Sequence, residues 1–180
     1  SNCRQMSGTY DECRSKMDEI RARDKLQPMQ GKAIIVLHGL FRTRSSMTSL
    51  SSALAKSETY NVFCVSYPTT RGSIEQHARS LDNIVRSMEG ISEINFVAHS
   101  LGNLVVRHWL HDFMAAERTL PQGQSFGRMV MLAAPNRQPK LATLLVRGAV
   151  DNFVAGPAAE SMATGWEILE PKLATPQFEF

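Results

Sequence analysis

INFVAHSLGN, residues 94–103, decides the fold, because a buried strand passes here directly into a helix through a serine. The apolar run ends at His99-Ser100, and a mostly apolar helical pattern extends from Leu101 to Arg118. A serine in so tight a bend adopts a strained backbone conformation, which projects its hydroxyl away from both elements. Strand and helix then pass so close that the positions two before and two after the serine must be small, as Ala98 and Gly102 are.

This serine motif has two interpretations when it is taken alone. It reads A-x-S-x-G, with Ala98 in place of the usual first glycine, which is a slightly less specific version of the nucleophile-bearing turn. Serine is also a favoured N-cap residue, so Ser100 is equally explained as an ordinary helix cap. The preceding strand and following helix favour the nucleophile, because they are the context that this motif requires.

Outward from this turn, three more apolar runs predict strands, and they alternate with longer helical patterns. The helix expected over 74–88 starts with a capping box formed by Ser73 and Gln76. Alternation of this kind predicts the α/β class, with a mostly parallel sheet covered by helices on both faces and every strand buried on both sides. The runs are AIIVLHG (33–39), NVFCVSY (61–67) and RMVMLAA (128–134).

The chain of 180 residues fits one core domain preceded by a helical arm. Residues 1–31 form the arm, an amphipathic helix expected to pack against the domain through Tyr10, Cys13, Met17 and Ile20. Residues 32–180 form the core. Within it, the glycines and prolines of residues 137–177 predict short helices and loops, and residues 178–180 (FEF) predict the start of another strand.

Composition excludes several classes of function. The net charge of +3 comes from charges of both signs spread along the chain, without a basic run, so no nucleic-acid partner is expected. The longest apolar run, residues 33–37, is far shorter than the roughly 20 residues of a membrane span. The three cysteines lack metal-ligand and paired spacing, so no metal, disulfide framework or cofactor is expected.

His38-Gly39-Leu40, at the end of the first strong strand, is the second feature that points to chemistry. The glycine lets the backbone turn sharply, and neighbouring parallel strands end at one edge of a sheet, so Leu40 and Ser100 are expected to lie close together. The backbone N–H groups of Leu40 and Leu101 would then be two oxyanion donors, each worth about 3 to 4 kcal/mol in the reaction barrier. The alternative is a turn that only ends the strand.

Four stretches resemble, in the correct order, small bacterial lipases and esterases of the α/β-hydrolase superfamily: VLHGLFRTRSSM, SYPTTRGSIEQHA, NFVAHSLGNLVVR and MLAAPN. VAGPAAESMATG is similar to a further stretch between the sixth and seventh family strands. Together they cover roughly residues 33–180. The resemblance implies a three-layer α/β-hydrolase-like sandwich with Ser100 as nucleophile and Leu40 and Leu101 as oxyanion residues.

The proton relay is the largest departure from this family. Acyl transfer by a serine requires a histidine base, which in this fold follows an acid that follows the serine. The only later histidines, His108 and His111, lie on the helix that starts at Ser100, and His108 is about 12 Å along it. His38, His77 and His99 are expected to be structural. On the order of 50 further residues are missing relative to a complete enzyme. We therefore expect a sheet truncated near the start of the seventh family strand, with 128–134 near an edge available for self-association.

Two functions from different classes remain open. The first is a serine carboxyl-ester hydrolase that acts on lipid-like or other acyl esters through an acyl-enzyme on Ser100, with Arg42, Arg44 and Tyr67 in contact with an acidic head group. Solvated loop residues are the alternative explanation for those three. The second is a catalytically silent scaffold, or fragment, that binds a ligand or partner. Ser1-Asn2 resembles a cleavage scar, which leaves open a lipid anchor on Cys3 of an exported protein, but the sequence does not fix the compartment.

Overall fold

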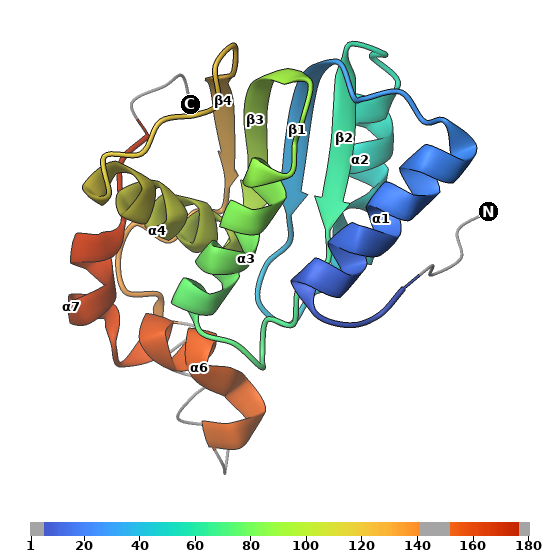
Figure 1. The fold of residues 1–180 in the computed structure, drawn as a ribbon. Coiled ribbons are helices and arrows are strands. Elements are labelled where there is room, and N and C mark those ends of the chain that lie inside the picture. The colour runs from blue at the N-terminus through green and yellow to red at the C-terminus, as the bar shows by residue number, and fades with distance from the viewer. Residues whose placement is uncertain (1–5, 141–151, 177–180) are drawn as a thin grey trace.

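The computed structural model describes residues 6–140 and 152–176, and its centre is a parallel sheet (Figure 1). The sheet order is β2-β1-β3-β4, so the first and third strands in the chain are neighbours at its middle. The strands end level with one another, since Leu37 of β1 pairs with Ala98 of β3. The strands are β1 (Gly31–Leu37), β2 (Tyr60–Val65), β3 (Ile91–His99) and β4 (Ser125–Leu132).

Helices cover both faces of the sheet, which confirms the predicted α/β class and its three layers. On one face α3 (Ile74–Arg86) and α4 (Leu101–Ala115) enclose the main core, and α2 (Thr48–Ala55) lies on the other with the 3-10 turn η1 (Arg44–Met47) (Figure 1). Residues of β1 alternate between the two layers: Ile35 faces the main core, whereas Ile34 and Val36 face α2. This alternation follows from the two-residue period of a strand.

Two of the predicted strands are less buried than expected. The prediction of burial on both faces is correct for most of β1 and β3. It is wrong for β2 and β4, because these are the outer strands among the described residues, where no neighbour covers the far side. Val130 of β4 is 48% exposed. Among the strands that the structure describes, β4 lies at an edge, as predicted.

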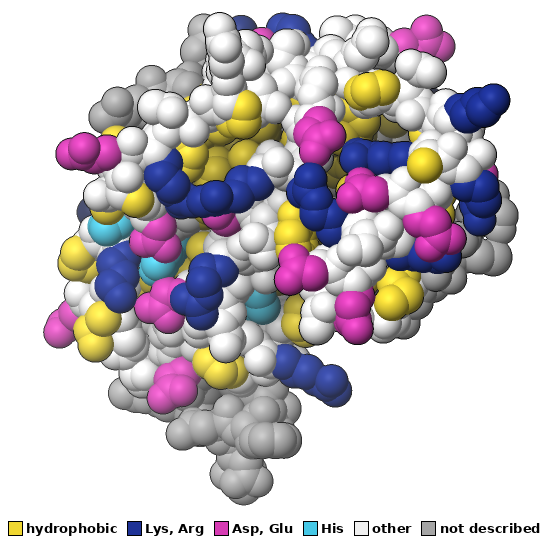
Figure 2. Space-filling view, viewed as in Figure 1, with side chains coloured by type: hydrophobic (Ala, Val, Ile, Leu, Met, Phe, Trp, Pro, Cys, Tyr) yellow, Lys and Arg dark blue, Asp and Glu magenta, His cyan; other side chains and the backbone are white. Residues whose placement is uncertain are grey.

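The N-terminal helix α1 (Tyr10–Asp24) forms where it was predicted, but it packs differently. None of its residues is buried. Of the four expected to face the domain, Cys13 and Ile20 are half-buried, whereas Tyr10 and Met17 are 43% and 36% exposed. The helix is instead attached by Arg14, whose guanidinium lies 3.0 Å from the Glu89 carboxylate. On the face formed by α1, α3 and α4, basic and acidic side chains are interspersed (Figure 2).

After β4 the described chain consists of short helices, as the glycines and prolines predicted. They are α6 (Asn152–Ala163), α7 (Trp166–Leu169) and the 3-10 turn η2 (Glu170–Lys172). Gly156 interrupts α6 with φ 77°, and a Cβ there would lie 2.2 Å from the Thr70 carbonyl oxygen, so α6 presses directly on the loop after β2. The predicted strand at 178–180 lies outside the described residues. No helix in residues 6–140 or 152–176 is long and apolar enough to span a membrane.

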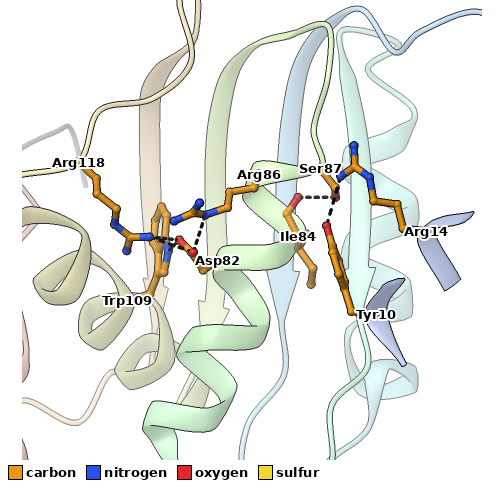
Figure 3. Close-up of polar contacts among 8 residues, drawn as sticks. All are labelled: Tyr10, Arg14, Asp82, Ile84, Arg86, Ser87, Trp109 and Arg118. Atoms are coloured by element: carbon orange, nitrogen blue, oxygen red, sulfur yellow. Dashed lines mark hydrogen bonds and ion pairs between the residues drawn. The ribbon is translucent and has the colours of Figure 1, made fainter. Parts of the chain in front are cut away.

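Hydrogen bonds to Asp82 connect α3 with α4 and with the chain that follows α4 (Figure 3). Its carboxylate accepts hydrogen bonds from the indole of Trp109 (2.9 Å), from Arg118 (2.8 Å) and from Arg86 (2.7 Å). Burial acts to raise the pKa of Asp82, but these three donors outweigh it, and the pKa lies below its ordinary value. The carboxylate is therefore ionised in the folded protein at neutral pH.

We expect Asp82→Ala to lower the free energy of unfolding by about 2 to 3 kcal/mol, because it leaves the buried Trp109 N–H without an acceptor and two guanidinium groups without their counter-ion. Urea unfolding at pH 7 measures this. The control is Asp24→Ala, whose exposed carboxylate pairs with neighbouring Arg23; its urea midpoint is expected to stay close to that of the wild type. Equal losses in the two variants would contradict the assignment.

Candidate active site

Ser100 occupies the bend between β3 and α4 in a strained conformation, with φ 50° and ψ −116°. A non-glycine residue with this conformation costs about 1 to 3 kcal/mol and persists only where its surroundings enforce it. Ser100 stands at the N-cap position of α4, yet its side chain makes no capping hydrogen bond. No hydrogen bond joins its hydroxyl to another described residue. The interpretation of Ser100 as an ordinary cap is therefore wrong.

Buried polar contacts enforce the bend. The Ser100 N–H donates to the carbonyl of Leu132 at 2.9 Å, which ties the bend to the end of β4. The side-chain amide of Asn103 donates to the same Leu132 carbonyl (3.1 Å) and to the carbonyl of Ser100 (3.2 Å). Asn103 is fully buried. Sequence reasoning missed this residue, although a lone amide within the apolar stretch LGNLVV was a usable signal.

Two glycines bring the end of β1 against this bend. A Cβ on Gly102 would lie 2.9 Å from Leu37 Cβ and 3.0 Å from the Leu37 carbonyl oxygen, so the start of α4 touches the β1 backbone. A Cβ on Gly39 would lie 3.1 Å from Ser100 Cβ. The predicted closeness of the HGL turn and the serine is confirmed, and Gly102 is required for it.

Within the HGL turn, the Gly39–Leu40 peptide is held by contacts on its carbonyl oxygen. The Gly39 carbonyl accepts from the Arg42 N–H at 3.2 Å and lies 3.1 Å from His38 Nδ1, a contact that assigns the proton of the neutral ring to Nδ1. In a trans peptide the N–H points opposite to the C=O, so these contacts also fix the direction of the Leu40 N–H. The Phe41 N–H donates to Thr69 Oγ1 at 3.2 Å. Among described residues, the amides of Leu40 and Leu101 have no acceptor.

Behind the turn, three aromatic side chains pack together. The ring of Tyr67 stacks on His38 (centroids 4.4 Å apart) and meets His77 edge to face (5.0 Å). The Tyr67 hydroxyl donates to the His38 carbonyl, and burial raises its pKa. His38 and His77 are 0% and 6% exposed. Burial lowers the pKa of each histidine, against a smaller opposing effect of one backbone hydrogen bond, so both rings are neutral at pH 7.

These two histidines predict a loss of stability in mild acid. Above about pH 6.5, these histidines are neutral in both the folded and the unfolded protein. Below about pH 6.5, they become protonated in the unfolded chain, whereas their lowered pKa values keep them neutral in the folded protein. The free energy of unfolding should therefore fall with decreasing pH, by up to about 1.4 kcal/mol per pH unit for each histidine. Urea unfolding at pH 7.5 and 5.5 measures the loss. His77→Gln should lose clearly less than the wild type over this interval, and an equal loss would refute the assignment.

None of the chain's five histidines, all of them described, hydrogen-bonds to Ser100. His99 adjoins the serine, and its Nδ1 would lie 2.7 Å from a Cβ on Gly39. His108 is buried on α4, with Nδ1 3.2 Å from the Asp112 carboxylate. No group of three histidine, cysteine, aspartate or glutamate side chains suited to a metal occurs in the part of the chain that the structure describes.

The predicted substrate residues divide into two kinds. Arg42 and Arg44 are exposed in the segment that follows the HGL turn. Tyr67 lies in the loop after β2, but its hydroxyl is bonded inward to the His38 carbonyl. The two arginines are therefore free to meet a ligand, whereas the tyrosine hydroxyl is engaged.

The strain at Ser100 is measurable without any substrate. Ser100→Gly removes the Cβ that this conformation penalises, whereas Ser100→Ala keeps it. We expect the glycine variant to exceed the alanine variant in free energy of unfolding by about 1 kcal/mol, which is the strain relieved minus the extra chain entropy of glycine. Thermal and urea unfolding of both variants test this. A glycine variant less stable than the alanine variant would show that the bend carries no strain.

Comparisons with known proteins agree with this architecture. The family described as a domain of unknown function (DUF7379) matches residues 3–146. No curated protein matches the chain. Among solved structures, the type II thioesterase BorB from the borrelidin biosynthetic cluster is similar, with 18% identity, a TM-score of 0.50, and coverage of 86% of this chain and 66% of that chain.

Two further structures are similar at lower scores. Polyneuridine aldehyde esterase has 13% identity and a TM-score of 0.46, over 82% of this chain and 69% of that chain. A pyrethroid hydrolase from Sphingobium faniae JZ-2 has 18% identity and a TM-score of 0.44, over 71% of this chain and 49% of that chain. The chain thus spans less than two-thirds of the thioesterase and about half of the hydrolase. At 18% identity, the likeness to the thioesterase shows the fold alone.

Proposed function

Because the chain belongs to the DUF7379 family, described as a domain of unknown function, we propose its function from the site itself: a serine carboxyl-ester hydrolase. The Ser100 oxygen attacks the ester carbonyl and gives up its proton to a base. The bond from the carbonyl carbon to the alcohol oxygen then breaks as the alcohol oxygen receives a proton, and the alcohol leaves. The acyl group stays on Ser100 until water attacks it and releases the acid. Leu40 and Leu101 donate their N–H groups to the oxyanion of each tetrahedral intermediate.

One observation carries this proposal: a strained serine with an unbonded hydroxyl beside a turn whose peptide is anchored through its carbonyl. Strain of this kind is retained where function needs it. Preorganised amide donors are the largest single contribution to many acyl transfers, because they need no reorganisation as charge develops. The partial exposure of Ser100 leaves room for a substrate to approach.

The proposal assigns to these 180 residues the nucleophile and the oxyanion donors, but not the general base. Among the described residues, no histidine hydrogen-bonds to the Ser100 hydroxyl. The base is therefore assigned to a group outside the described residues. Without a base, the donors and the bound geometry still supply about 10³- to 10⁴-fold acceleration over water.

The substrate class is a lipid-like or other acyl ester. Arg42 and Arg44, exposed beyond the HGL turn, would contact an acidic head group. Their side chains are solvated, so we expect them to contribute to binding rather than to the chemical step. No cofactor is required for this chemistry.

A second candidate is a scaffold that binds a ligand or partner without catalysis. It is favoured by the lack of a hydrogen bond between the Ser100 hydroxyl and any histidine among the described residues. A silent scaffold has no need of strain at the serine, whereas a nucleophile does. The two candidates therefore differ in whether Ser100 forms a covalent adduct.

The experiment is labelling with a fluorophosphonate, with and without added imidazole, followed by peptide mass spectrometry. The serine oxygen bonds to phosphorus, fluoride leaves, and imidazole takes up the proton as the missing base. We expect one adduct, on the peptide that contains Ser100, formed faster as imidazole is added. No adduct at any imidazole concentration would contradict the hydrolase and support the scaffold.

A further inference from the structure

Two side chains of the loop after β2 hold the HGL turn on both sides of its Gly39–Leu40 peptide. Before this peptide, the Tyr67 hydroxyl donates to the His38 carbonyl. After it, Thr69 Oγ1 accepts from the Phe41 N–H at 3.2 Å. Thr69 is 4% exposed, so this hydroxyl is shielded from competing water. The peptide that carries the Leu40 N–H is thus held by one hydrogen bond before it and one after it, both from the same loop.

The bond to Thr69 is made by a residue with a strained backbone, Phe41. Phe41 has φ 55°, a left-handed conformation that costs a bulky residue about 1 to 2 kcal/mol. Its side chain is 47% exposed and therefore contributes little packing that would enforce this conformation. Two hydrogen bonds hold it: from the Phe41 N–H to Thr69 Oγ1 and from the Arg42 N–H to the Gly39 carbonyl, each 3.2 Å long. Without the bond to Thr69, only the second keeps the turn closed, and the neighbouring Leu40 amide is held less firmly.

The loop is itself held rigidly. Tyr67 is packed between the rings of His38 and His77, and His77 lies on α3. On the other side, α6 abuts the Thr70 carbonyl through Gly156. Because the loop is packed on both sides, the hydroxyl groups of Tyr67 and Thr69 have fixed positions. They therefore fix the positions of the His38 carbonyl and the Phe41 N–H, to which they are hydrogen-bonded.

From these contacts we infer that Tyr67 and Thr69 are positioning residues: together with the contacts on the Gly39 carbonyl, they hold the direction of the Leu40 N–H and thereby set the strength of the oxyanion site. This inference rests on the proposed function. It also gives Tyr67 a role different from contact with the substrate head group, because its hydroxyl is already bonded to the His38 carbonyl.

Kinetics of fluorophosphonate labelling separate the two roles of Tyr67. Tyr67→Phe removes the hydroxyl and keeps the stacked ring. We expect its maximal labelling rate in imidazole to fall about 10-fold, with little change in the half-saturating concentration of probe, equally for a neutral and an acidic probe. Thr69→Val should behave likewise, and Thr69→Ser, which keeps a hydroxyl, should recover most of the rate. A rise in half-saturation for the acidic probe alone would overturn the inference in favour of head-group contact.

Hydrogen exchange at the Phe41 and Arg42 amides, measured by NMR, reports on the turn without any chemistry at Ser100, because both N–H groups are hydrogen-bonded within it. We expect Tyr67→Phe to accelerate exchange at Phe41 and Arg42 about 10-fold. Tyr60→Phe, in the half-buried strand β2, should leave it unchanged. Unchanged exchange in Tyr67→Phe overturns the inference. Accelerated exchange in a protein that never labels at Ser100 would support the positioning role and refute the proposed hydrolase.

Discussion

Ser100→Ala is expected to lower the second-order rate constant for fluorophosphonate labelling of the whole chain by about 10³-fold, measured in the presence of imidazole. The alanine lacks the oxygen that forms the bond to phosphorus. The chain's other serines remain, but none is expected to stand beside two unbonded amides. The free energy of unfolding should equal that of the wild type within about 0.5 kcal/mol, because the Ser100 hydroxyl bonds to no described residue.

Ser57→Ala is the matched control for this result. Ser57 lies exposed in the turn between α2 and β2, away from the edge of the sheet that carries Ser100. Its labelling rate should equal that of the wild type. If Ser100→Ala labels as fast as Ser57→Ala, or if the adduct maps to another serine, Ser100 is not the nucleophile.

Gly102→Val is expected to lower the free energy of unfolding by about 3 kcal/mol. The new Cβ would lie 2.9 Å from Leu37 Cβ and about as close to the Leu37 and His38 carbonyl oxygens. These atoms belong to the backbone of β1 or adjoin it, so no side-chain rotation relieves the overlap. Either α4 moves from the sheet or β1 bends, and both separate the HGL turn from Ser100. Labelling at Ser100 should consequently fall by about 10²-fold, the cost of one lost oxyanion donor.

Ala115→Val is the control for the helix itself. It places the same β-branched side chain on an exposed position near the end of α4, where the cost is that of helix propensity, below about 1 kcal/mol. Urea unfolding and labelling of both variants distinguish a close contact from a general weakening of α4. A Gly102→Val protein as stable as Ala115→Val would show that the elements do not approach each other at this point.

Local signals were sufficient to predict how the strand, the serine and the helix follow one another. Ala98 and Gly102 flank Ser100 as a close approach requires, and the structure has the approach at Gly102. The closeness of the HGL turn followed from one topological rule, that neighbouring parallel strands end at the same edge. Because β1 and β3 are neighbours, that rule was enough.

Other features depended on tertiary contacts that no local pattern contains. The exposure of Val130 follows from which strands stand at the outside of the sheet, and apolar content does not reveal this. Tyr10 and Met17 have helical spacing, yet α1 is attached through the Arg14–Glu89 pair instead of through them. The inward bond of Tyr67 was unpredictable for the same reason, since its acceptor lies 29 residues earlier in the chain.

The most direct test of the proposed oxyanion site is a crystal structure of the phosphonate adduct on Ser100. The phosphonyl oxygen stands where the carbonyl oxygen of a tetrahedral intermediate would develop its charge. We predict that this oxygen lies about 2.7 to 3.1 Å from both the Leu40 and the Leu101 amide nitrogens. A phosphonyl oxygen directed to solvent, with the Leu40 N–H turned toward another acceptor, would contradict the account.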